Sequence, residues 1–252
     1  MLPIWRIIAR FHFARGDYDK ALTLYRRIVA LGGIPNDKLS LSRILLKTGH
    51  FAEAEKLLRS LSQSDLRPAE IIQAKLNLAL AIWKQGDLDD AVRRVELVYA
   101  DNKVTHVYAT LGYLYIEQGD LARALAFNQE AFEYNSQNAE IRDNLGQCLQ
   151  ELGETEKALE IYAALAKEKT PPFFPEWHFH YGLTLLDAGH REEALVQLRI
   201  ARNWRITGLS VLTKEKVQDV IDRVEAEATV GVDSVEPPTD PASLSSGTPP
   251  EA

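Results

Sequence analysis

Cysteine is almost absent from this 252-residue chain, in which Cys148 is the only one. A single cysteine excludes an intramolecular disulfide framework and any metal site built from two or more cysteines. Long apolar runs are missing too, because charged residues or glutamine interrupt each apolar stretch before it reaches the roughly 20 residues of a membrane span. Residues 1–30 also lack the charged start, apolar core and small-residue cleavage site that mark a signal peptide. These absences predict a protein of the cytoplasm.

Signatures of catalysis and metal binding are equally scarce. The sequence contains no HExxH, Walker A or GxSxG motif. His178 and His180 stand two residues apart, which places them on nearly opposite faces of a helix, where they cannot share a metal ion. We therefore predict a protein that is not an enzyme, with no catalytic residue, no metal site and no cofactor.

The net charge of −7 is unevenly distributed. Residues 1–60 carry eleven basic and five acidic residues, a charge of +6, and the remainder of the chain carries −13. An acidic chain is not expected to bind nucleic acid. The basic first quarter is typical of a solvated helical surface, but it leaves a local anionic partner open.

A pair of residues, glycine and an alanine five positions later, recurs through the chain at nearly constant spacing. The pairs flanked by apolar residues are Gly16/Ala21, Gly49/Ala54, Gly86/Ala91, Gly119/Ala124, Gly153/Ala158 and Gly189/Ala194. Successive glycines are separated by 33, 37, 33, 34 and 36 residues. A period of this length is the sequence signature of a repeat architecture.

The residues around each glycine repeat as well. Seven positions before it stands a small residue: Ala9, Ser42, Ala79, Gly112, Gly146 or Gly182. Apolar residues at helical spacing surround these positions, which predicts two amphipathic helices joined by a glycine turn. The small residue and the alanine let the two helices approach closely. We therefore expect Gly146 at a helix crossing, Cys148 buried in the adjacent joint, and Lys84 in contact with water.

These units closely resemble the tetratricopeptide repeat. The best examples are Leu111-Gly112-x-x-Tyr115 followed by Gly119 and Ala124, and Leu145-Gly146 followed by Gly153, Ala158 and Tyr162. The resemblance implies an all-α, right-handed α-solenoid with six helix-turn-helix units at residues 2–208. The predicted units lie near 2–35, 35–68, 69–105, 105–138, 139–172 and 175–208. Thr213 can cap an amphipathic helix over 213–228, which would cover the end of the solenoid. Residues 230–252 are rich in proline, serine and acids and are predicted to be disordered.

The resemblance also implies a concave groove lined by the first helix of each unit. At the groove positions of the family this chain places Arg6, Arg10, Asn77, Trp83, His106, Thr110, Tyr113, Asp143, Asn144, Gln147, Phe179 and His180. Asparagine can bond both the N–H and the C=O of an extended peptide, and aromatic rings add stacking area. Each polar residue alone is also compatible with ordinary solvation of a helix face.

A second candidate contact surface is the edge of the first unit. Ile4, Ile7 and Phe11 occupy positions that would touch a preceding unit, and the first unit begins near Leu2. An uncovered apolar edge beside arginines is expected to pack on a second copy, on a partner subunit or against an anionic membrane surface. The alternative is that the first turn frays and the exposure is tolerated.

Two functions follow from these patterns. The leading prediction is a non-catalytic scaffold or adaptor that binds a segment of a partner protein in the groove. The alternative is a structural assembly factor that docks to a multisubunit or membrane-associated complex through its N-terminal edge.

Overall fold

The computed structural model describes residues 2–61, 66–168 and 174–232, and within these ranges the chain forms helices and no strand. The helices are α1 (Leu2–Ala14), α2 (Tyr18–Ala30), α3 (Pro35–Lys47), α4 (Phe51–Arg59), α5 (Pro68–Trp83), α6 (Leu88–Asp101), α7 (Thr105–Glu117), α8 (Leu121–Tyr134), α9 (Ala139–Glu151), α10 (Thr155–Ala166), α11 (Pro175–Asp187), α12 (Arg191–Asn203) and α13 (Lys214–Val232). The predicted all-α class is confirmed.

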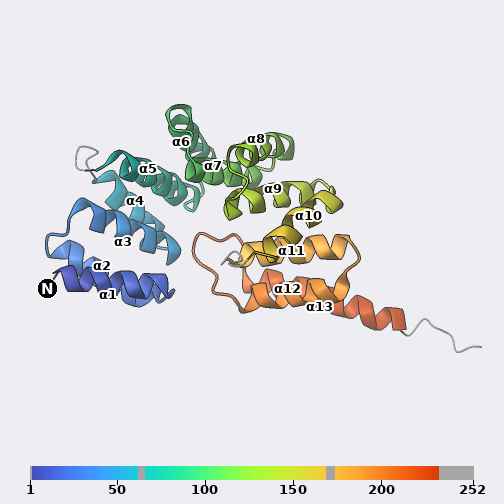
Figure 1. Ribbon diagram of the computed structural model, residues 1–252. Coiled ribbons are helices and arrows are strands. Elements are labelled where there is room, and N and C mark those ends of the chain that lie inside the picture. Colours follow the sequence, from blue (N-terminus) through green and yellow to red (C-terminus); the bar gives the residue numbers. More distant parts are fainter. Residues whose placement is uncertain (1, 62–65, 169–173, 233–252) are drawn as a thin grey trace, which may run out of the picture.

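The helices from α1 to α12 pack in consecutive pairs, and each pair packs against the next to form a curved solenoid (Figure 1). The six repeat glycines stand at the turns inside the pairs, all with positive φ, between 76° and 104°. A residue with a Cβ atom adopts this left-handed conformation only at a cost, which explains why glycine recurs there. The division of residues 2–208 into six units stays a prediction, with α1 to α12 as its helices.

The small residues lie where the helices of a pair cross. All six repeat alanines, from Ala21 to Ala194, have no exposed surface. At Gly146 a Cβ atom would stand 2.8 Å from the ring of Tyr162 on the following helix. Cys148 is also fully buried. The predicted helix crossing and the predicted burial of the thiol are confirmed.

The last helix closes one end of the solenoid. The hydroxyl oxygen of Thr213 accepts a hydrogen bond from the Lys216 amide at 3.1 Å, as predicted for the N-cap. Val217, Ile221 and Val224 are buried, and the helix packs on α12. α13 continues to Val232, beyond the predicted end at residue 228. The predicted disorder of residues 230–252 therefore does not hold for 230–232, and residues 233–252 lie outside the described part of the chain.

None of the helices in the described ranges combines the length and the apolar character required to cross a lipid bilayer.

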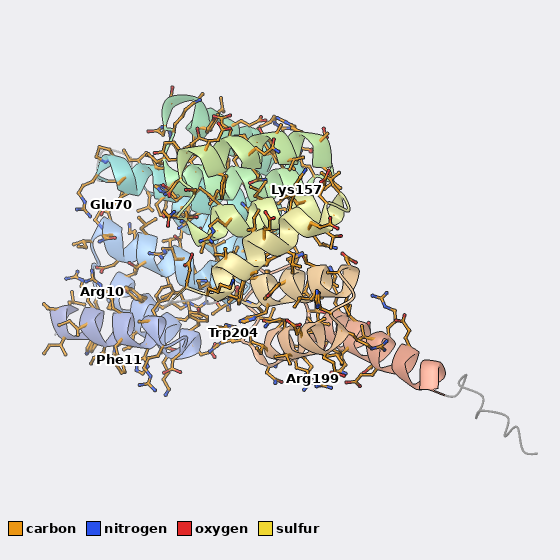
Figure 2. The ribbon with its side chains drawn as sticks, turned by 45° about the vertical axis from the view of Figure 1, so that its right-hand side comes forward. Arg10, Phe11, Glu70, Lys157, Arg199 and Trp204 are labelled. Carbon is orange, nitrogen blue, oxygen red and sulfur yellow. The ribbon has the colours of Figure 1, made fainter. Side chains whose placement is uncertain are left out.

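The connector between α12 and α13, residues 204–213, was not expected to reach beyond its own neighbours. It turns back across the open side of the solenoid toward the N-terminal helices (Figure 1). Trp204 accordingly lies between the first and the last helices of the molecule (Figure 2). The connector thus joins two parts of the chain that are more than 150 residues apart, as the contact of Arg205 with Gly16 shows.

Candidate functional site

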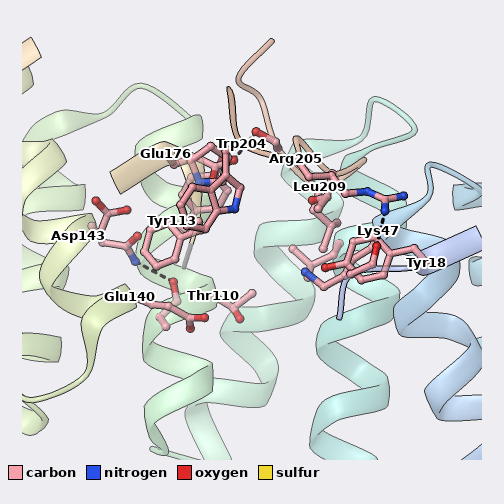
Figure 3. Close-up of a pocket in the computed structure, with 18 of the residues that line it drawn as sticks. Tyr18, Lys47, Thr110, Tyr113, Glu140, Asp143, Glu176, Trp204, Arg205 and Leu209 are labelled. Carbon is pink, nitrogen blue, oxygen red and sulfur yellow. Dashed lines mark hydrogen bonds between the residues drawn. The ribbon is translucent and has the colours of Figure 1, made fainter. Parts of the chain in front are cut away.

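A pocket of about 740 Å³ lies where the first helices of successive pairs face the connector (Figure 3). Its walls come from the ends of α1 and α3, from α5, α7 and α9, from the start of α11 and from the connector itself. The side chains that matter for its chemistry are Tyr18, Lys47, Trp83, Thr110, Tyr113, Glu140, Asp143, Glu176, Trp204, Arg205 and Leu209.

The centre of the pocket is aromatic. The rings of Trp83 on α5 and Tyr113 on α7 meet edge to face, with centroids 5.5 Å apart and planes at 81°. This arrangement is favourable for aromatic rings and holds both side chains in fixed orientations. Leu80 and Leu209 add apolar surface beside them. Such a surface can take up an apolar or aromatic group and remove it from water.

One wall of the pocket is acidic. Glu140 and Asp143 come from α9, and Glu176 comes from the first turn of α11. Asp143 is only 6% exposed, and its Oδ1 atom has no hydrogen-bond partner among the described residues. Burial, together with the charges of Glu176 and Glu140, raises the pKa of the Asp143 carboxyl well above its ordinary value.

The opposite wall is basic. Arg15 follows α1, Lys47 ends α3, and Arg205 belongs to the connector. Burial lowers the pKa of Lys47, and its Nζ atom lies 5.7 Å from the centroid of the Tyr18 ring. The pocket therefore separates positive charge, on the side of α1 and α3, from negative charge, on the side of α9 and α11.

The connector is held across this pocket mainly through backbone atoms. The Gly208 amide donates to the Lys47 carbonyl at 2.8 Å, and the Lys84 ammonium donates to the Ser210 carbonyl at 2.9 Å. Arg205 donates to the Gly16 carbonyl and lies 4.8 Å from the Tyr18 ring centroid. A turn of the connector, closed by the hydrogen bond from the Ser210 amide to the Thr207 carbonyl at 3.1 Å, thus already binds to the ends of α3 and α5 in this fold.

The environment of Lys84 differs from the prediction. The side chain was predicted to face water, yet it is half-buried, lies 4.4 Å from the Trp83 ring centroid and bonds the connector. The helical pattern of α5 placed this residue on an open face. It contained no sign that a segment about 120 residues later would cover that face.

Five of the predicted groove residues meet at this pocket: Trp83, Thr110, Tyr113, Asp143 and Asn144. Their roles differ. Asn144 is buried and donates to the Ala109 carbonyl at 2.9 Å, so its amide N–H already joins α9 to α7. Thr110 donates to the carbonyl of His106 on its own helix at 2.8 Å.

Three other predicted groove residues lie between helices instead. Arg6 forms a two-point ion pair with the buried Asp37 of α3, with a shortest distance of 2.7 Å. Asn77 is 3% exposed and donates to Ser42 Oγ at 3.2 Å. Phe179 is 3% exposed, in a core cluster with residues of α12 and α13. Arg6 and Asn77 join neighbouring first helices, and the terminal helix covers Phe179, so none of the three lines the pocket.

The remaining four predicted residues do not line the pocket. Arg10 and His106 are exposed on α1 and α7. Gln147 is buried and donates to Glu151 Oε1 at 2.8 Å. The imidazole of His180 has an Nδ1 atom with no partner in the described part of the chain, and burial lowers its pKa to about 3.

Sequence reasoning missed the connector and the residues that it contributes, Trp204, Arg205 and Leu209. Lys47 and Glu140 stand at groove positions of the family, whereas Glu176 was missed. Glu176 could have been found from its register, because it stands thirteen positions before Gly189, as Glu140 does before Gly153. The connector could not, because its contacts depend on the curvature of the whole solenoid rather than on a local pattern.

The N-terminal edge is exposed. Ile4, Ile7 and Phe11 are 62%, 68% and 55% exposed, respectively. Arg15 lies 5.3 Å from the Phe11 ring centroid, whereas the Arg6 guanidinium is held by Asp37, away from the edge. Figure 2 shows Phe11 on the outer side of the first helix.

The thiol of Cys148 is poorly suited to act as a nucleophile. Burial raises its pKa to about 12, so the thiolate that a nucleophile requires is not populated near neutral pH. Its nearest polar neighbour is the Asn128 amide, at 3.6 Å. Within the ranges that the structure covers, no three histidine, cysteine, aspartate or glutamate residues are grouped closely enough to hold a metal ion.

Comparison with known families and proteins gives a consistent result. Three models described as tetratricopeptide repeat match residues 9–27, 39–103 and 115–178. A probable UDP-N-acetylglucosamine–peptide N-acetylglucosaminyltransferase SEC from Arabidopsis thaliana is 30% identical over 90 residues, which are 35% of this chain and 9% of that protein. The match therefore concerns a small part of that relative.

Among solved structures, a tetratricopeptide repeat protein from Parabacteroides merdae is similar with a TM-score of 0.50 and 13% identity. The similarity covers 89% of this chain and 98% of that one. TTC0263 from Thermus thermophilus has a TM-score of 0.49 and 20% identity, and covers 90% of this chain and 100% of its own. At these identities the likeness concerns the fold alone.

Proposed function

Because this chain belongs to the tetratricopeptide repeat family, we propose that it is a non-catalytic scaffold or adaptor that binds an extended segment of a partner protein in the concave pocket. Repeat proteins of this architecture present extended concave surfaces, and these surfaces serve binding rather than chemistry. The pocket offers two elements that an extended peptide can use: an aromatic centre and charged walls of both signs.

The observation that carries the proposal is the way the connector lies in this pocket. Gly208 and Ser210 are held through their backbone N–H and C=O groups, by the Lys47 carbonyl and the Lys84 ammonium respectively. The Lys47 carbonyl and the Lys84 ammonium, at the ends of α3 and α5, thus bind main-chain groups of a segment that lies outside the helices, which supports main-chain recognition at this face. The cavity left beside the connector has room for several side chains of such a segment.

The partner segment is proposed to enter between the connector and α7–α9. There the edge-to-face pair of Trp83 and Tyr113 supplies the apolar contact, and the carboxyl groups on α9 and α11 supply the charge. Buried aromatic anchors of this type carry most of the binding free energy in protein interfaces.

The test is a selection from a random peptide library displayed on phage, followed by calorimetry with the selected peptides. Saturable binding with a stoichiometry near one, lost on Tyr113→Ala but retained on Tyr134→Ala, is the expected result. Tyr134 is a matched control because it is 49% exposed, on α8 and away from the pocket lining. Peptides that bind both variants as well as the parent protein would place recognition elsewhere.

A second candidate function is supported by the exposure of Ile4, Ile7 and Phe11. Three large apolar side chains on one edge of a helix form a surface of the kind that docks to another protein or to a membrane. On this view the chain is a structural assembly factor that attaches through α1, and the pocket plays no part. Ile4→Asp combined with Phe11→Asp separates the two functions, because both side chains are more than half exposed and neither lines the pocket.

A further inference from the structure

The acidic wall contains a group that the fold alone does not explain. The Asp143 carboxyl is withdrawn from water, with 6% of the residue exposed, yet its Oδ1 atom has no partner in the part of the chain that is described. A buried acceptor without a hydrogen bond destabilises a protein, and a buried carboxylate without a counter-charge destabilises it more. Such groups are retained where they act on a ligand.

We propose that the wall formed by Glu140, Asp143 and Glu176 is a subsite for one cationic side chain, arginine or lysine, of the bound segment. This inference rests on the proposed function and specifies the chemistry of its ligand. The cation would lie between α9 and α11, beside the Tyr113 ring, and would give Asp143 a counter-charge and its Oδ1 atom a hydrogen-bond donor.

The charges around Asp143 favour a cation from several directions. Glu140 lies one turn away on α9, and Glu176 approaches from α11. The hydroxyl of Tyr162 on α10 bonds the Asp143 backbone carbonyl at 3.4 Å and also acts on the carboxyl group, where it offsets part of the rise in the pKa without adding positive charge. The packed neighbours thus surround Asp143 with acids and neutral hydroxyls.

Lys47 and Lys84 interact electrostatically with Glu176, and Lys47 also with Glu140, but the direct contacts of both lysines are made elsewhere. Lys47 is directed to the Tyr18 ring, and Lys84 donates to the Ser210 carbonyl. No ion pair joins Glu140, Asp143 or Glu176 to a basic side chain within residues 2–61, 66–168 and 174–232. Glu176 instead accepts a hydrogen bond from the Ser210 hydroxyl. The position of the missing counter-charge is therefore open to a ligand.

The spacing of the acids favours an organic cation over a metal ion. A metal ion requires its oxygen ligands within about 2–2.6 Å of one point. No group of three acidic, histidine or cysteine residues in the described ranges meets that condition. A guanidinium group carries five N–H donors spread over a plane, so it can bond carboxyl groups that do not converge. Tyr113 provides an aromatic face or edge for the same group.

The test uses small probes rather than a peptide, so that it does not depend on finding the partner. Isotope-labelled full-length protein is titrated by NMR with N-acetylarginine amide and, separately, with N-acetylcitrulline amide. Citrulline has nearly the same shape as arginine and no charge. We expect the arginine probe to shift signals of Tyr113, Asp143 and Glu176 saturably, and the citrulline probe to bind at least roughly tenfold more weakly, as the loss of a charge-assisted hydrogen bond requires.

The variants are Asp143→Asn and, as a matched control, Asp101→Asn. Asp101 is exposed at the end of α6 and does not line the pocket. Asp143→Asn should lower the affinity for the arginine probe about tenfold while leaving that for the citrulline probe unchanged, and Asp101→Asn should change neither. A melting curve of each variant confirms that it is folded.

Equal affinities of the two probes, or an arginine effect that survives Asp143→Asn, would overturn the subsite. The peptide selection reports separately on the proposed function. If the selected peptides bind at Tyr113 but contain no basic residue at a fixed position, the scaffold function stands and the cation subsite falls. If no peptide is selected and the arginine probe still requires Asp143, the subsite stands and the peptide-binding function falls.

Discussion

Gly208 lies directly against Gly49, although 159 positions separate them in the sequence. A Cβ atom at position 208 would stand 2.6 Å from the Gly49 amide nitrogen and 2.7 Å from the Leu46 carbonyl oxygen. Because the atoms in the way belong to the backbone, no side-chain rearrangement relieves the contact. The approach lets the Gly208 amide donate to the Lys47 carbonyl, which is one of the free carbonyls at the end of α3.

The first prediction follows from this contact. Gly208→Val should detach the connector from α3, with a loss of stability of about 1–3 kcal/mol, as is typical of overpacking. Hydrogen exchange at residues 204–212 should accelerate more than exchange in α7 or α9. Val211→Thr is the control, since Val211 is 38% exposed in the same connector. Unchanged exchange in the Gly208 variant would contradict the docking of the connector.

The second prediction concerns the crossing of α9 and α10. Gly146→Leu should destabilise the protein by roughly 1–3 kcal/mol or more, because its side chain would collide with the Tyr162 ring. Repeat stability is close to a sum over neighbouring units, so the joint between α9–α10 and α11–α12 should weaken as well. Arg10→Ala, on an exposed part of α1, is the comparison in chemical denaturation. Equal midpoints for the two variants would contradict the packing described here.

The third prediction uses the raised pKa of Asp143. A carboxyl whose pKa is higher in the folded than in the unfolded protein makes the protein less stable as pH rises above the unfolded value, roughly 3.9. Asp143→Asn removes this penalty. The variant should therefore match the parent near pH 4 and exceed its melting temperature increasingly toward pH 8. Asp101→Asn should show no such divergence, and a constant difference at all pH values would argue against a buried, protonated Asp143.

The fold and the candidate site differ in how far the sequence predicts them. The helix crossings, the glycine turns and the cap at Thr213 depend on contacts within a unit or between neighbours, and their residue types recur at fixed spacing. The prediction of the groove depended on assigning the groove positions of the family to individual residues of this chain. Trp83 and Tyr113 line the pocket, but Phe179 is covered by α13, whose position no repeat pattern indicates.

The fourth prediction concerns the aromatic centre of the pocket. Tyr113→Ala should weaken binding of a selected peptide by about 2–4 kcal/mol, the range seen for buried aromatic anchors. Its partner Trp83 loses an edge-to-face contact but keeps its place on α5, so the melting temperature should change little compared with the affinity. Asn144 is unsuitable for this test, because its amide joins α9 to α7 and its removal would disturb the helices themselves. An affinity unchanged by Tyr113→Ala would remove the pocket from recognition.

The last prediction concerns the N-terminal edge. Ile4→Asp combined with Phe11→Asp should abolish self-association or membrane attachment through α1, because a charged side chain is strongly disfavoured in an apolar interface. Both residues are more than half exposed, so the double variant should fold and melt like the parent protein. Binding of a selected peptide at the pocket should be unaffected, because neither residue lines it. Analytical ultracentrifugation tests self-association, and flotation with anionic liposomes tests membrane attachment. If the parent protein sediments as a monomer, ignores the liposomes and loses no partner on deletion of residues 1–11, this edge is not a contact surface, and the exposed side chains of α1 are simply tolerated.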